Sequence, residues 1–144
     1  MTITLEFLKE KRACSEAIEY FNKQNLSLDA IGWVEHLIKI DNLDWANWFI
    51  VRCMSYKQRI SYAVYAAKQV LPIYEKKHPK DKRPRKTIEA AEKCIKDPSR
   101  KNKDAAAANA ANTSAYAAAA NAAAARKKMR LKILRYGIKL LRKK

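Results

Sequence analysis

Apolar residues recur at intervals of three and four along most of the chain, a spacing that is typical of amphipathic helices. Alternation of apolar and polar residues with a period of two, which is typical of strands, is scarce. Only two Gly and four Pro interrupt the 144 residues. The pattern therefore predicts an all-α fold, and we expect residues 1–144 to form a single-domain helical bundle.

Residues that commonly cap helices mark where the expected helices begin. Ser15 and Ser55 are expected N-caps, and Pro84 suits a first helical turn. Pro72 should kink the long helix that contains it. The predicted helices cover residues 5–12 after Thr4, 16–23, a segment from Ser27 or Asp29 to a turn at Asp41 and Asn42, then 42–52, 56–77, 83–96 and 126–144.

The stretch 105–125 is unlike any other part of the chain. Fifteen of its twenty-one residues are Ala, and none is charged. Because Ala has the highest helix propensity and an exposed helix normally carries charges, we expect a central helix around which the bundle packs. A low-complexity linker is the alternative.

Few residues in the chain suggest catalysis or metal binding. Cys14, Cys53 and Cys94 are far apart, no C-x-x-C pair is present, and there are only two His, at 36 and 78. We expect buried free thiols, no metal site and no cofactor. No phosphate-binding glycine loop and no hydrolase motif is present, so a non-enzymatic protein is expected.

Positive charge is concentrated in one half of the chain. Residues 1–75 hold nine Lys or Arg and nine Asp or Glu, whereas residues 76–144 hold twenty-two and five. The second half therefore carries the whole net charge of +17. This asymmetry favours an acidic partner, either nucleic acid or an acidic protein surface.

Two basic segments supply the candidate binding residues. The terminal segment 126–144 has ten basic residues, no acidic residue, and an apolar stripe at Leu131, Leu134, Ile138 and Leu141 that is expected to pack on the core rather than on a membrane. The candidate residues are Lys80, Lys82, Arg83, Arg85 and Lys86 in the loop after residue 77, and Lys128, Lys132, Arg135, Lys139 and Arg142 in the terminal helix.

Three arginines and two tryptophans admit a structural interpretation as well. Arg83 and Arg85 would be structural if they paired with a buried carboxylate such as Glu89 or Asp44, and Arg52 has the same two candidate partners. Residues 45 and 48, both Trp, share a helical face. They are expected to anchor the core, and an exposed aromatic platform is the alternative.

Several short motifs resemble a known family. They are Asp81, Arg83-Pro84-Arg85, Ile88-Glu89-Ala90-Ala91, the alanine-rich stretch, Arg126, Met129, Ile133-Leu134 and Tyr136-Gly137, with Asp44-Trp45 and Trp48 in the first half. This pattern resembles small all-helical immunity proteins of bacterial polymorphic-toxin loci, which have relatives in phages. The resemblance implies a helical bundle that binds and blocks a partner, without cofactor or catalysis.

Two features depart from that family. Lys82 separates the acidic residue from the R-P-R motif, and the charge of +17 is opposite to that of inhibitors that mimic nucleic acid. We therefore expect a cytoplasmic, non-enzymatic inhibitor or immunity protein, similar to an anti-CRISPR. Its partner would be a toxin or a defence effector complex, with or without bound nucleic acid, and neither a membrane nor a small-molecule substrate. The alternative is an autonomous nucleic-acid-binding protein.

Overall fold

The computed structural model describes residues 2–97, 99 and 123–143, and within them the prediction of an all-α fold is confirmed. These residues contain no strand, only an isolated antiparallel bridge between Thr2 and Asp29. Most of the alanine-rich stretch lies outside the described residues, so its expected role as a central helix stays a prediction. The helices are α1 (Leu5–Glu10), α2 (Ser15–Gln24), α3 (Ala30–Lys39), α4 (Leu43–Cys53), α5 (Tyr56–Lys77), α6 (Arg83–Lys96) and α8 (Ala123–Arg142).

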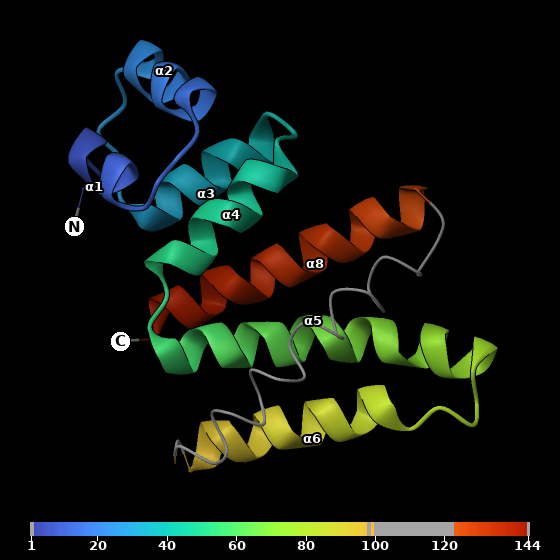
Figure 1. The fold of residues 1–144 in the computed structure, drawn as a ribbon. Coiled ribbons are helices and arrows are strands. Elements are labelled where there is room, and N and C mark those ends of the chain that lie inside the picture. Colours follow the sequence, from blue (N-terminus) through green and yellow to red (C-terminus); the bar gives the residue numbers. More distant parts are fainter. Residues whose placement is uncertain (1, 98, 100–122, 144) are drawn as a thin grey trace. The chain divides into compact units, whose positions relative to one another are not determined.

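The chain divides into two compact units (Figure 1). Unit 1 comprises Met1–Met54 and Gly137–Lys144, and unit 2 comprises Ser55–Tyr136. Helix α8 begins in unit 2 and ends in unit 1, whereas every other described helix belongs to one unit.

Local capping determines where the helices of unit 1 begin. The Thr4 hydroxyl accepts a hydrogen bond from the Phe7 N–H, and Asp29 accepts one from the Gly32 N–H at 2.8 Å. The expected cap at Ser15 is wrong: Ser15 is the first helical residue, and Cys14 occupies the N-cap position without a side-chain capping bond. The caps at Thr4 and Asp29 were predicted, whereas Asn42, which was expected only in a turn, also caps α4 by accepting from the Trp45 N–H at 3.2 Å.

Aromatic and aliphatic side chains of α3 and α4 form the core of unit 1. Trp33 is 3% exposed, Val34 and Ile50 are fully buried, and Phe49 is 4% exposed. The Phe7 ring packs edge-on against Phe49, with ring centroids 6.1 Å apart, and brings α1 onto this core. Residues from three helices thus share one apolar centre.

Unit 2 is built on α5, which the sequence predicted with the same bounds. Ser55 and Gln58 form a reciprocal capping box, and the helix continues through Pro72 for 22 residues. Buried Val64 and Ala67 of α5 pack against Ile88 of α6, so these two helices lie side by side. This packing places the loop between them at one end of the unit (Figure 1).

The terminal helix α8 is packed rather than exposed on its apolar side. Leu134 is 1% exposed and Ile138 is 7% exposed, while Leu131 and Leu141 are half-buried. Within unit 2, the Tyr136 ring stacks on the Tyr65 ring of α5, with centroids 3.9 Å apart and planes 11° apart. None of the helices in the described part of the chain is both long and apolar enough to cross a membrane.

Candidate partner-binding surface

The loop between α5 and α6 and the first turn of α6 present to solvent all five residues that were predicted to bind from a loop. Helix α5 ends at Lys77, and α6 begins at Arg83 with Pro84 buried in its first turn, as the sequence predicted. Lys80, Lys82, Arg83, Arg85 and Lys86 are all exposed. Their arrangement differs from the prediction because the two arginines are hydrogen-bonded to carboxylates, whereas among the lysines only Lys82 contributes, through its charge, to the lowered pKa of Glu75.

Asp81, in the loop, holds Arg83 at the start of α6. The Arg83 guanidinium donates to both carboxylate oxygens, from Nε at 2.9 Å and from Nη2 at 2.7 Å, and its backbone N–H donates at 3.1 Å. The Tyr74 hydroxyl donates a further hydrogen bond at 2.7 Å from α5. Arg83 and then Tyr74 are the main reasons that the pKa of Asp81 lies well below its ordinary value.

Glu75 and Arg85 form a second ion pair with two hydrogen bonds. Arg85 donates from Nε at 2.9 Å and from Nη2 at 2.8 Å to the two oxygens of Glu75 on α5. These hydrogen bonds lower the pKa of Glu75. The carboxylate side chains of Glu75 and Asp81 are 22% and 17% exposed, whereas the arginine side chains are 51% and 75% exposed. The two pairs therefore fix the loop against α5 at its surface.

The predicted carboxylate partners of the arginines are wrong. Asp44 and Glu89 are both exposed, so neither is the buried carboxylate that was expected. Arg52 is also exposed: its guanidinium carbon lies 3.8 Å from the centroid of the Trp48 ring, and Nη1 donates to the Trp48 carbonyl at 3.0 Å. Arg52 is therefore held by an aromatic face and a backbone oxygen instead of an acid.

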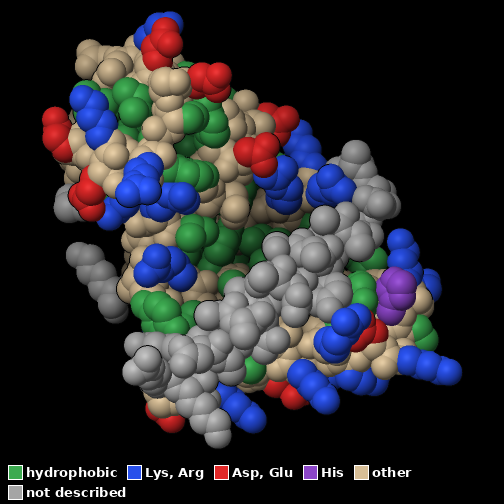
Figure 2. Space-filling view, in the orientation of Figure 1, with side chains coloured by type: hydrophobic (Ala, Val, Ile, Leu, Met, Phe, Trp, Pro, Cys, Tyr) green, Lys and Arg blue, Asp and Glu red, His purple; other side chains and the backbone are tan. Residues whose placement is uncertain are grey.

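Three lysines of the loop region have no comparable partner. Lys80, Lys82 and Lys86 make no side-chain hydrogen bond or ion pair with another residue in the described part of the chain. Figure 2 shows Lys and Arg side chains gathered along the edge of unit 2 where α6 and its loop lie. These lysines are the loop charges that are available to a partner.

The second predicted set forms an exposed stripe along α8. Its five residues, Lys128, Lys132, Arg135, Lys139 and Arg142, are all exposed, with spacings of three and four residues. The first three belong to unit 2 and the last two to unit 1. Arg142 donates to Glu35 of α3 within unit 1 at 3.2 Å, and both side chains are more than half exposed.

Unit 2 carries residues of both sets. Helix α8 begins at the end where α5 finishes and the loop follows (Figure 1). Lys128 lies near that beginning, while Lys132 and Arg135 follow along the helix. Unit 2 therefore carries exposed positive charge on its loop and on the unit 2 part of α8.

Only one of the three thiols is buried as predicted. Cys94 is buried with its sulfur 3.4 Å from the Tyr56 hydroxyl, and burial raises the pKa of the half-buried Cys53 thiol to about 11. Cys14, at the N-cap of α2, is exposed. Among the described residues, no group of three potential metal ligands is present.

The sequence did not reveal how the aromatic residues of unit 1 assemble. Trp45 and Trp48 are half-buried, between the expected core anchor and the exposed platform. Tyr20 of α2 and His36 of α3 are joined by a hydrogen bond at 2.8 Å, and the Tyr20 ring packs edge-on against Trp45. These partners are far apart in sequence, and no local motif marks them.

Comparison of the chain with protein-family models, with curated proteins and with solved structures gave no match. The resemblance to immunity proteins therefore stays a prediction.

Proposed function

We propose that this chain is a non-enzymatic inhibitor or immunity-type protein that binds and blocks a bacterial toxin or a defence effector complex. The observation that carries the proposal is the difference between the arginines and the lysines in the loop between α5 and α6 and in the first turn of α6. Arg83 and Arg85 are held by internal carboxylates, whereas Lys80, Lys82 and Lys86 stay exposed and without an ion pair to another described residue.

This difference between arginines and lysines favours binding on physical grounds. A loop that is already ordered loses less conformational entropy on binding than a flexible loop does. Asp81 and Glu75 order the backbone through the two arginines, and the lysines project from that ordered loop. Their partner would be an acidic protein surface, or the phosphates of nucleic acid carried by the target.

The net charge supports the same proposal through association kinetics. A charge of +17 would attract an acidic target over a distance of about one Debye length, ~8–10 Å at physiological salt, and would raise the association rate. It would also oppose any interaction with the basic active site of a nuclease. The proposed target is therefore engaged on an acidic surface and not by mimicry of nucleic acid.

The exposed stripe on α8 favours one alternative, an autonomous nucleic-acid-binding protein. Its lysines and arginines could each neutralise a phosphate without any base readout. In that case binding would need no protein target.

A salt series distinguishes the two functions. The purified protein is titrated into fluorescent duplex DNA and single-stranded RNA from about 50 to about 200 mM salt, and is separately used to capture proteins from host lysate. An inhibitor should capture one protein or complex that survives nuclease treatment, with weak binding to free nucleic acid. Tight binding to free nucleic acid that falls by roughly 10³-fold or more over this range would support the alternative instead.

A further inference from the structure

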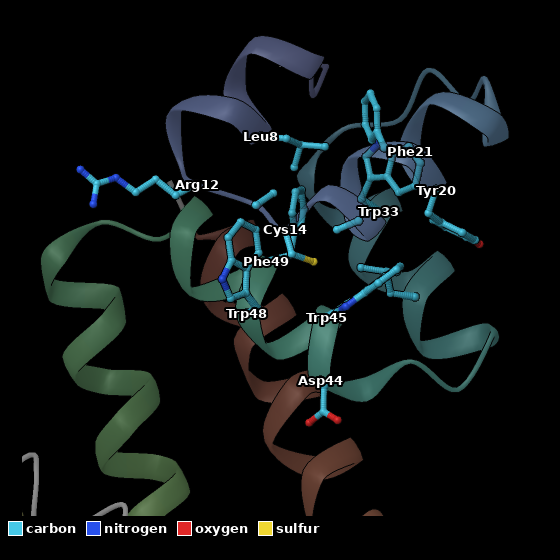
Figure 3. Close-up of a pocket in the computed structure, with 13 residues that line it drawn as sticks. Leu8, Arg12, Cys14, Tyr20, Phe21, Trp33, Asp44, Trp45, Trp48 and Phe49 are labelled. Atoms are coloured by element: carbon cyan, nitrogen blue, oxygen red, sulfur yellow. The ribbon is translucent and has the colours of Figure 1, made fainter.

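Unit 1 contains an apolar pocket that the proposed function does not use. Its volume is about 360 Å³, within the range of roughly 300–1,000 Å³ that is typical of small-molecule sites. Six aromatic side chains from α2, α3 and α4 line it (Figure 3). They are Tyr20, Phe21, Trp33, Trp45, Trp48 and Phe49.

Contacts between these rings hold the pocket open in a defined shape. Phe21 stacks on Trp33 with ring centroids 4.7 Å apart, and Tyr20 meets Trp45 at 5.6 Å. The hydrogen bond between Tyr20 and His36 fixes the Tyr20 ring from the side of α3. The walls of the pocket are therefore already formed before a ligand binds, which reduces the entropy lost on binding.

The charges near the pocket do not enter it. Arg12 and Asp44 are lining residues, but their charged ends point away from the aromatic cluster (Figure 3). An ionised ligand would thus lose its water without gaining a partner of opposite charge. The pocket contents should be neutral.

Among the described residues, one buried polar atom of a lining residue lacks a hydrogen-bond partner. Trp33 is 3% exposed, and its indole Nε1–H has no hydrogen-bond acceptor among the described residues. A buried donor without an acceptor costs stability, and few such groups persist in native proteins. Because this nitrogen has almost no accessible surface, it does not face the pocket and offers a ligand no hydrogen bond.

We propose that this pocket is a binding site for an uncharged, planar aromatic small molecule of about the size of naphthalene or a phenyl-naphthalene. The rings would provide stacked and edge-on contacts, which is the recognition that aromatic walls offer best. The proposal concerns binding alone, and the charged ends of the lining residues Arg12 and Asp44 point away from the rings. The site is separate from the basic loop in unit 2 and does not depend on the proposed function.

The protein provides its own reporter for this site. The chain has three Trp, and all three line the pocket. The probe is N-phenyl-1-naphthylamine, an uncharged aromatic amine that fluoresces in apolar surroundings. Adding it to the full chain should quench Trp emission and increase probe emission along one saturable curve, with a dissociation constant on the order of 10–100 μM.

Two leucine substitutions of equal size test where the probe binds. Ala17 lines the pocket and is half-buried, so Ala17→Leu should fill the space and weaken probe binding by at least about tenfold. Ala63 lies exposed on α5, so Ala63→Leu should leave binding unchanged. Thermal melting of both variants establishes that they are folded.

A second readout uses Cys14, which lines the pocket and is exposed. A saturating amount of the probe should slow the reaction of this thiol with a disulfide reagent by several-fold. If Ala17→Leu does not fold, this protection of Cys14 decides whether the probe binds in the pocket. The proposal is overturned if the probe shows no saturable binding, if Ala17→Leu binds it as well as the native chain, or if Cys14 is not protected.

Discussion

Truncation of Leu134 to alanine should destabilise the protein strongly. Leu134 lies on α8 and is 1% exposed, so almost all of its side chain is removed from water. The substitution deletes three carbon atoms, which corresponds to about 2.4 kcal/mol of transfer free energy at ~0.8 kcal/mol for each buried carbon. The cavity left behind adds to this, and buried Leu→Ala substitutions cost roughly 2.7–5 kcal/mol in total.

The expected loss in the free energy of unfolding is measured by urea unfolding, and the melting temperature by thermal unfolding, both followed by far-ultraviolet circular dichroism. In a chain of this size each kcal/mol lowers the melting temperature by roughly 2–4 °C, so a fall of about 6 °C or more is expected. Lys132→Ala on the exposed side of the same helix is the matched control and should change stability by less than about 0.5 kcal/mol. If Leu134→Ala cost less than about 1 kcal/mol, the apolar stripe would not be packed, and a membrane-facing role for α8 would regain support.

Three further predictions concern the loop and the thiols. Because the pKa of Asp81 is lower in the folded protein than in the unfolded chain, its contribution to stability is present above pH ~4 and is lost as the pH falls below that. The stability difference between the native chain and Asp81→Asn should therefore narrow at low pH in denaturation curves. Arg85→Ala should lower the melting temperature more than Lys86→Ala does, because Arg85 joins the first turn of α6 to Glu75 of α5 and Lys86 has no such ion pair; equal effects would contradict this. With a disulfide reagent at pH ~8, the exposed Cys14 thiol should give a rapid reaction phase that is absent from Cys14→Ser. The Cys53 thiol, whose pKa is about 11, should react slowly.

Helix positions could be predicted because their signals are local. Thr4, Asp29 and Ser55 accept hydrogen bonds from N–H groups three residues further on, so each start is encoded within one turn. The same logic failed at Ser15, since Cys14 precedes it and takes the N-cap position without a capping bond. A favourable side chain at one position does not decide which of two neighbours begins the helix.

The site was only partly predictable. The exposure of the basic residues follows from their charge, but the partners of the arginines depend on how α6 packs against α5. Arg85 reaches Glu75 across ten residues of sequence, and the sequence offered Glu89 and Asp44 as equally plausible partners. Asp81 and Arg83 are only two residues apart, so their ion pair could have been predicted from the sequence, but it was not.

The aromatic pocket could not be predicted at all. Its walls require α2 to pack beside α3 and α4, with Tyr20 bonded to His36 sixteen residues away. The tryptophan spacing in α4 indicated a shared face, but it did not indicate that the face borders a cavity instead of a filled core.

The most direct test of the central claim is charge reversal in the loop. Lys80, Lys82 and Lys86 are all replaced by Glu, and the control variant carries the same change of charge at Lys9, Lys39 and Lys57, which are exposed on other helices. The dissociation constant is measured for both variants against the target captured by the native protein. We expect the loop variant to bind at least about tenfold more weakly while melting normally, and the control to retain near-native affinity. Native affinity in the loop variant, or an equal loss in both, would contradict a binding site at this loop.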